Sequence, residues 1–124
     1  MYKIFLIGIA GLCGTLARYY LSGWADQWWG GTFPFGTFIV NAIGCLAVGF
    51  LFHATEEKYL IDPAVRSAVL VGFLGGFTTF SSFAIQSFNL FRGGEIFLAS
   101  INILISNIAG LILVWFGYTL SRVI

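Results

Sequence analysis

Four long stretches of this chain carry almost no fixed charge. Residues 27–55, 67–91 and 96–121 contain no Asp, Glu, Lys or Arg, and residues 4–21 contain only Arg18. A helix needs about 20 apolar residues to cross the hydrocarbon core of a bilayer. Charged residues make up 9% of the chain, against about 25% in a typical soluble domain, so there is too little charge to cover a surface that faces water. We therefore predict an all-α integral membrane protein.

Four membrane spans are predicted, at about residues 4–21, 33–54, 64–91 and 96–121. The first connector holds three tryptophans, whose amphipathic rings favour the headgroup level. The other connectors are short and polar. Since no segment is left for a soluble domain, residues 1–124 are expected to form a single transmembrane domain, with any activity inside the membrane or at its faces.

The positive charges differ little between the two sides of the predicted bundle. The side that holds the N-terminus has Lys3, Lys58, Arg66 and Arg122, and the other side has Arg18 and Arg92. The positive-inside rule acts on this difference. Because the bias is small, we expect the chain to insert in both orientations.

Small and polar residues share one face of the first predicted span. Gly8, Gly11, Thr15 and Arg18 recur at helical spacing. Small residues let neighbouring helices approach closely, and an arginine near a span end can extend its head to the interface. Arg18 is alternatively predicted to supply positive potential at an aqueous vestibule, where it would attract anions.

Two further spans carry polar stripes. Thr37 and Asn41 lie four residues apart in the second span, and Asn102, Ser106 and Gly110 repeat this spacing in the fourth. Hydrogen bonds between helices would explain each polar residue taken alone. A polar pathway built from the same residues is the alternative.

The third span contains Gly75-Gly76-Phe77-Thr78-Thr79-Phe80-Ser81-Ser82-Phe83, a segment that predicts an interrupted helix. Each glycine lowers helix propensity by about 1 kcal/mol, and the neighbouring hydroxyls can bond to freed backbone groups. Broken helices of this kind commonly bind ions. Phe80 and Phe83 would share a face, and their positive ring edges could line a path for a small anion. Aromatic packing is the alternative reading.

No predicted span contains Asp or Glu, which bears on the class of protein. Proton-coupled transporters usually need an intramembrane acid, so a small proton-coupled exporter is disfavoured. His53 is the sole histidine, and neither a Ser/His/Asp set nor a phosphate loop is present, so an enzyme is not expected. A membrane subunit without transport activity would not need the interrupted third span.

Three segments carry a resemblance to a known family. They are Gly14-Thr15-Leu16-Ala17-Arg18-Tyr19, Gly36-Thr37-Phe38-Ile39-Val40-Asn41-Ala42-Ile43-Gly44 and the third-span segment that starts at Gly75. With them, the chain resembles the Fluc (CrcB) fluoride channels of bacteria over nearly its whole length. The resemblance implies an antiparallel, dual-topology homodimer in the cell inner membrane. It also implies two fluoride pathways, each lined by both subunits.

The resemblance further implies roles for individual residues. A structural Na⁺ at the dimer centre would be held by the backbone carbonyls of Gly75 and Thr78. The implied fluoride pathway comprises Asn41, Thr37, Phe80, Phe83, Ser81, Ser82, Asn102 and Ser106, with Arg18 in the vestibule. Gly110 supplies no hydroxyl where some relatives have one. The implied activity is passive export of fluoride, which protects a cell that HF enters in neutral form.

Overall fold

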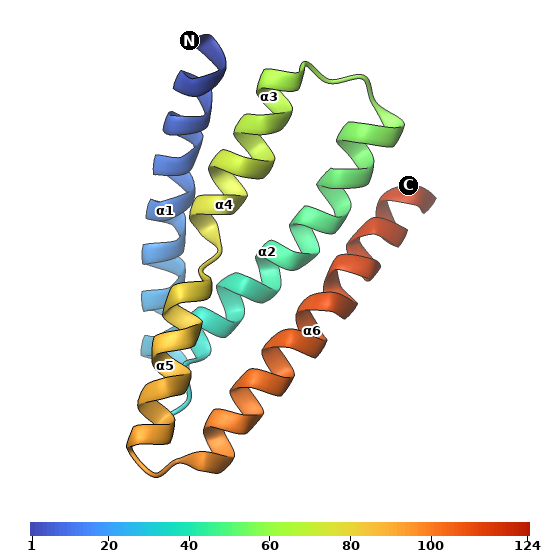
Figure 1. Ribbon diagram of the computed structural model, residues 1–124. Coiled ribbons are helices and arrows are strands. Elements are labelled where there is room, and N and C mark those ends of the chain that lie inside the picture. The colour runs from blue at the N-terminus through green and yellow to red at the C-terminus, as the bar shows by residue number, and fades with distance from the viewer.

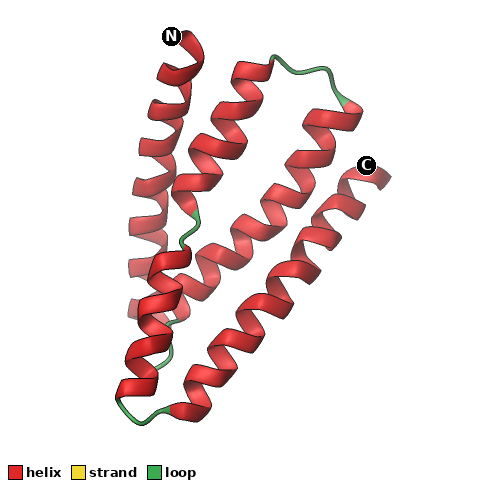
Figure 2. Ribbon diagram, in the orientation of Figure 1, coloured by secondary structure: helices red, strands yellow, loops and turns green.

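The computed structural model describes residues 1–124 and is built from helices joined by short connectors (Figure 2). Four helical stretches are long and apolar enough to cross a membrane: Tyr2–Trp29, Phe35–Lys58, Pro63–Arg92 and Ile96–Val123. The predicted all-α architecture with four apolar spans is therefore confirmed. The two termini lie at the same end of the molecule (Figure 1), as an even number of spans requires.

The first helix, α1 (Tyr2–Trp29), is longer than the predicted span, which ends at Leu21. No proline lies between Leu21 and Trp29, and Ala25 in this extension is completely buried. Asp26 ties the extension to the next helix, because its Oδ1 accepts a hydrogen bond from the Gly36 backbone N–H at 2.7 Å. The tryptophans of the predicted connector therefore lie on the last turns of α1.

Helix α2 (Phe35–His53) continues into a short π-helical turn, η1 (Ala54–Lys58), and packs along α6 (Ile96–Val123) (Figure 1). Glycines make this approach possible. A side chain at Gly117 would collide with the Leu46 carbonyl and lie 2.9 Å from the Phe50 backbone nitrogen. Close contact through small residues is typical of helix pairs in membranes.

The third span consists of four helical pieces: α3 (Pro63–Ser67), η2 (Ala68–Phe73), α4 (Leu74–Phe77) and α5 (Phe80–Arg92). It begins at Asp62, whose side chain accepts hydrogen bonds from Ala64 N at 2.8 Å and Val65 N at 3.3 Å. η2 is π-helical, which the sequence pattern does not predict. Between α4 and α5, Thr78 and Thr79 have extended backbone, with φ/ψ of −90°/158° and −149°/111°.

Helix α1 packs against η2 and α4 rather than along the whole third span. Gly11 and Gly14 of α1 lie at this contact, whereas Gly8 of the predicted stripe has no such neighbour. A side chain at Gly14 would collide with the Phe73 carbonyl, and one at Gly76 would lie 2.6 Å from the Gly11 carbonyl oxygen. α5 packs instead against α6, with a smaller contact to α2. The two halves of the third span therefore have different neighbours.

The outer surface of the bundle is strongly apolar. Only 20 of 124 residues are buried, and the exposed side chains include Leu111 and Trp115 on α6. In water such a surface would be unfavourable, but it suits contact with lipid chains. Together with the four apolar helices, it describes a multi-pass membrane protein.

Candidate functional site

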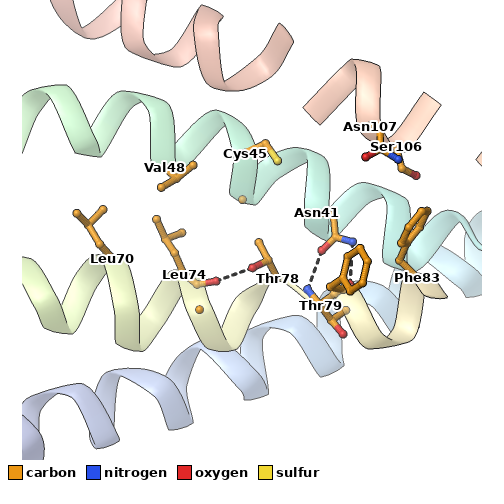
Figure 3. A pocket seen from close by; sticks show the side chains of 13 residues that line it. Asn41, Cys45, Val48, Leu70, Leu74, Thr78, Thr79, Phe83, Ser106 and Asn107 are labelled. Carbon is orange, nitrogen blue, oxygen red and sulfur yellow. Dashed lines mark hydrogen bonds between the residues drawn. The ribbon is translucent and has the colours of Figure 1, made fainter. Parts of the chain in front are cut away.

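A groove of about 370 Å³ opens at the extended segment of the third span (Figure 3). It is bounded by α2, α4, the start of α5 and the middle of α6. The lining residues that were predicted for the site are Asn41, Gly75, Thr78, Phe80, Phe83 and Ser106. The structure thus brings together polar and aromatic residues from three of the four spans.

The Asn41 side chain is bonded to the backbone of Thr79 in both directions (Figure 3). Its Oδ1 accepts from Thr79 N–H at 2.8 Å, and its Nδ2 donates to the Thr79 carbonyl at 3.1 Å. An extended residue between two helices would otherwise leave these groups unpaired inside the membrane. A carboxamide has two N–H groups, so Asn41 retains one donor that is not used by Thr79.

Arg18 lies at the same break, on the side of α1. Its Nε donates to the Gly76 carbonyl at 3.0 Å, and its side chain is half-buried. Gly76 is in the last turn of α4, where helix carbonyls lack intrahelical partners and a positive charge is favourable. Arg18 therefore stabilises the end of α4 and places a positive charge next to the third-span break.

Several carbonyls at the break, including those of Gly75 and Thr78, accept none of the hydrogen bonds made there. Thr79 N–H binds Asn41 instead of Gly75, and Thr78 N–H and Oγ1 both donate to the Leu74 carbonyl at 3.0 Å. This leaves the carbonyl oxygens of Gly75 and Thr78 without donors. Gly75 is exposed, and no atom lies within 4 Å of where its Cβ would be. Free carbonyls at a helix break are groups that bind hard cations.

Phe80 and Phe83 occupy the first turn of α5. Their ring centroids are 5.7 Å apart and the ring planes make an angle of 49°. Phe80 is 79% exposed, and Phe83 is half-buried. The edges of aromatic rings are positive and the faces negative. Where such edges face the groove, they can stabilise an anion weakly, with no fixed charge.

The hydroxyls that follow the break serve mainly to start α5. Thr79 Oγ1 accepts from Ser82 N–H at 3.2 Å and donates to Ser82 Oγ at 3.1 Å. This is the usual N-cap arrangement for threonine. Ser81 and Ser82 do not line the groove, and neither does Thr37, which is buried one turn before Asn41 on α2.

On α6, Ser106 lines the groove, whereas Asn102 is only 1% exposed. Ser106 Oγ donates to Asn102 Oδ1 at 3.3 Å, and Asn102 Nδ2 donates to Ser87 Oγ at 2.9 Å. Gly110 has a packing role, since a side chain there would lie 3.3 Å from Cys45 Sγ. Within the α6 stripe, Ser106 therefore lines the groove, Asn102 is buried, and Gly110 contacts α2.

Several site residues were not predicted from the sequence. Asn107, Cys45 and Gly44 line the groove, and Ser87 contacts Asn102 beneath it. Ser87 follows Phe83 by four residues, a spacing that places both on one side of α5, and this signal could have identified it. Gly44 lets the third-span break approach α2 closely, because a side chain at this position would collide with Thr78 Cγ2.

Comparison with known proteins gives a consistent family. Residues 5–118 match the family described as CrcB-like protein, Camphor Resistance (CrcB). The chain is 42% identical over its full length to a protein of Geotalea daltonii that is likewise fully covered. It is 43% identical to one from Nitrosococcus oceani, with 98% of both chains covered. Both relatives are named fluoride-specific ion channel FluC.

Proposed function

This chain belongs to the CrcB-like family, and from this membership we propose that it is a fluoride-selective ion channel. The predicted resemblance to that family is confirmed. The relatives are channels and not enzymes, which agrees with the lack of a catalytic set in the sequence. The observation that carries the proposal is the third-span break, where Asn41 holds Thr79 beside the rings of Phe80 and Phe83.

The groups at this break suit a small anion. α5 begins here, and the first N–H groups of a helix have no intrahelical partner and give its N-terminus a partial positive charge. The positive ring edges and the spare Asn41 N–H add weak donors, and Arg18 adds a full positive charge. Many small, fixed donors can replace the hydration shell of a compact ion such as fluoride. A narrow path would exclude the larger chloride.

The working unit is proposed to be an antiparallel homodimer with two pathways. Phe80 is 79% exposed in one chain although it lines the groove, and Gly75 is exposed beside it. A second copy placed over this open side would enclose the groove and complete its wall. The nearly balanced positive charges of the two sides are compatible with opposite insertion of the two copies.

A Na⁺ ion is proposed at the dimer centre. The carbonyls of Gly75 and Thr78 fit this role, since they accept no hydrogen bond and Gly75 faces the open side. When bound, the ion would supply positive charge beside the anion pathway and neutralise carbonyls from both copies. This chain would contribute the carbonyls: Thr79 N–H bonds Asn41 instead of Gly75, and Ser82 N–H bonds Thr79 Oγ1 instead of Thr78.

The direction of transport is proposed to be outward and passive, across the bacterial inner membrane. HF crosses membranes in neutral form and dissociates at neutral pH, so fluoride accumulates inside. The predicted spans at residues 4–21, 33–54, 64–91 and 96–121 contain no acid that could couple transport to protons. An open path for the anion is then sufficient for export.

Flux from liposomes tests the proposal. The purified protein is reconstituted into vesicles loaded with potassium fluoride, and efflux is started with a potassium ionophore and followed with a fluoride electrode. We expect rapid loss of fluoride, and vesicles loaded with chloride should retain their content. Equal release of both anions, or no fluoride release by folded protein, would refute a fluoride-selective channel.

A further inference from the structure

A chain of hydrogen bonds leads from the groove to the backbone of Phe83 through buried side chains. Ser106 Oγ donates to Asn102 Oδ1 at 3.3 Å, Asn102 Nδ2 to Ser87 Oγ at 2.9 Å, and Ser87 Oγ to the Phe83 carbonyl at 2.8 Å. Asn102 is 1% exposed and Ser87 5% exposed. These two residues therefore contact the lining of the groove from behind and do not line it themselves.

The donors and acceptors in this series of hydrogen bonds determine one orientation for the Asn102 amide. Ser87 has a single hydroxyl proton, which it gives to the Phe83 carbonyl, so its oxygen can only accept from Asn102. The Nδ2 group must then point to Ser87, and Oδ1 must point to Ser106. Because both middle members are buried, breaking one bond would leave a polar atom without a partner.

The same series of hydrogen bonds limits the position of α5. At its start, α5 is joined to α2 by the two bonds between Asn41 and Thr79. One turn beyond Phe83, it is joined to α6 by the bond between Ser87 and Asn102. Phe83 lies between these two attachments, on a helix whose other faces are largely exposed.

We infer that Ser87 and Asn102 are positioning residues, which fix the ring of Phe83 at the groove by joining α5 to α6 and thereby set fluoride flux and selectivity. This inference rests on the proposed function and adds residues to its site. Asn102, predicted from the family resemblance to line the pathway, acts in this view through Ser87 and Phe83. Removal of the Ser87 hydroxyl lets α5 shift against α6 and moves the ring edge away from the ion.

The test compares Ser87→Ala with Ser87→Thr in the liposome flux assay, with fluoride and chloride measured separately. Ser87→Ala should lower fluoride flux by about tenfold, the effect of one lost buried hydrogen bond, and reduce the preference over chloride. Ser87→Thr keeps the hydroxyl and should restore both. The matched control is Thr119→Val, which also removes a hydroxyl bonded to the carbonyl four residues earlier, that of Trp115, but has no amide partner.

A double substitution separates positioning from folding. Ser87→Ala with Asn102→Leu removes both partners and leaves no unpaired polar atom between them, so thermal stability should return towards that of the parent. Fluoride flux should remain as low as in Ser87→Ala alone, because the two residues act as one unit. Flux that recovers together with stability would overturn the inference. If the parent conducts fluoride and Ser87→Ala equals it, the inference fails while the proposed function stands; if the parent does not conduct, the proposed function itself fails.

Discussion

Among individual residues, Asn41 pairs both the backbone N–H and the backbone carbonyl of Thr79. Asn41→Leu should therefore lower the stability of the folded protein by about 1–3 kcal/mol, because both polar groups of Thr79 become unpaired. Fluoride flux should fall with it. Thermal unfolding in detergent and liposome flux measure the two effects. Asn107→Leu is the matched comparison: Asn107 also lines the groove but donates only to the Ile103 carbonyl, so its stability loss should be smaller.

The ring edges of Phe80 and Phe83 lead to a second prediction. Phe80→Ile or Phe83→Ile keeps an apolar side chain but removes the positive edge, and we expect fluoride flux to fall by about tenfold or more, as for loss of a well-placed polar contact. The protein should remain folded, which size-exclusion chromatography checks. Phe88→Ile is the control, since Phe88 is exposed on α5 outside the groove. Unchanged flux in both groove variants would contradict the ring-edge path.

Among the helices, the meeting of α2 with the third-span break depends on a glycine. Gly44→Ala would place a methyl group against Thr78 Cγ2, and overpacking of this kind costs about 1–3 kcal/mol. We expect lower stability and lower fluoride flux, because Thr78 must move and the groove with it. Gly8→Ala is a matched control with no atom within 4 Å of the added carbon. Equal effects of the two substitutions would show that the Gly44 contact is unimportant.

The sequence predicts these elements to different extents. Stretches with almost no charge locate all four spans, because the hydrocarbon core disfavours charge. The predicted first span ends at Leu21, and the sequence does not predict that α1 continues to Trp29, since tryptophans favour the interface whether or not the helix continues through them. The π-helical stretch η2, which packs against α1, has no local signature in the sequence.

The sequence predicts some of the residues that line the groove, such as Asn41, Phe80 and Ser106, but not how they are connected. Periodicity places Asn41, Asn102 and Ser106 on helix faces, yet it does not say which neighbour each face meets. In the structure, Asn41 is hydrogen-bonded to the backbone of Thr79, the N-cap of α5, and Asn102 is hydrogen-bonded to Ser87 on α5. Such pairings depend on how α2, α5 and α6 cross. They therefore require the three-dimensional structure.

For the molecule as a whole, dual topology can be tested through charge. Adding three lysines after Ile124 should hold that end in the cytoplasm, because the existing bias is small. Adding them instead to the Arg92–Glu95 turn should give the opposite orientation. Each variant alone should fail to protect cells from fluoride, and coexpression should restore protection by allowing antiparallel pairs. Full protection by one fixed orientation would contradict the antiparallel homodimer.

The division of the third span between different neighbours affects how the protein responds to its lipids. α3, η2 and α4 lie against α1, whereas α5 lies against α6, and only Thr78 and Thr79 join the two halves. An uninterrupted helix answers hydrophobic mismatch by tilting as one rod. In this protein the extended residues Thr78 and Thr79 can change the angle between the two halves of the third span, so each half can tilt separately when the bilayer thickness changes. We expect fluoride flux to change little between short-chain and long-chain phosphatidylcholine vesicles, and to become strongly dependent on chain length once Asn41→Leu loosens the junction.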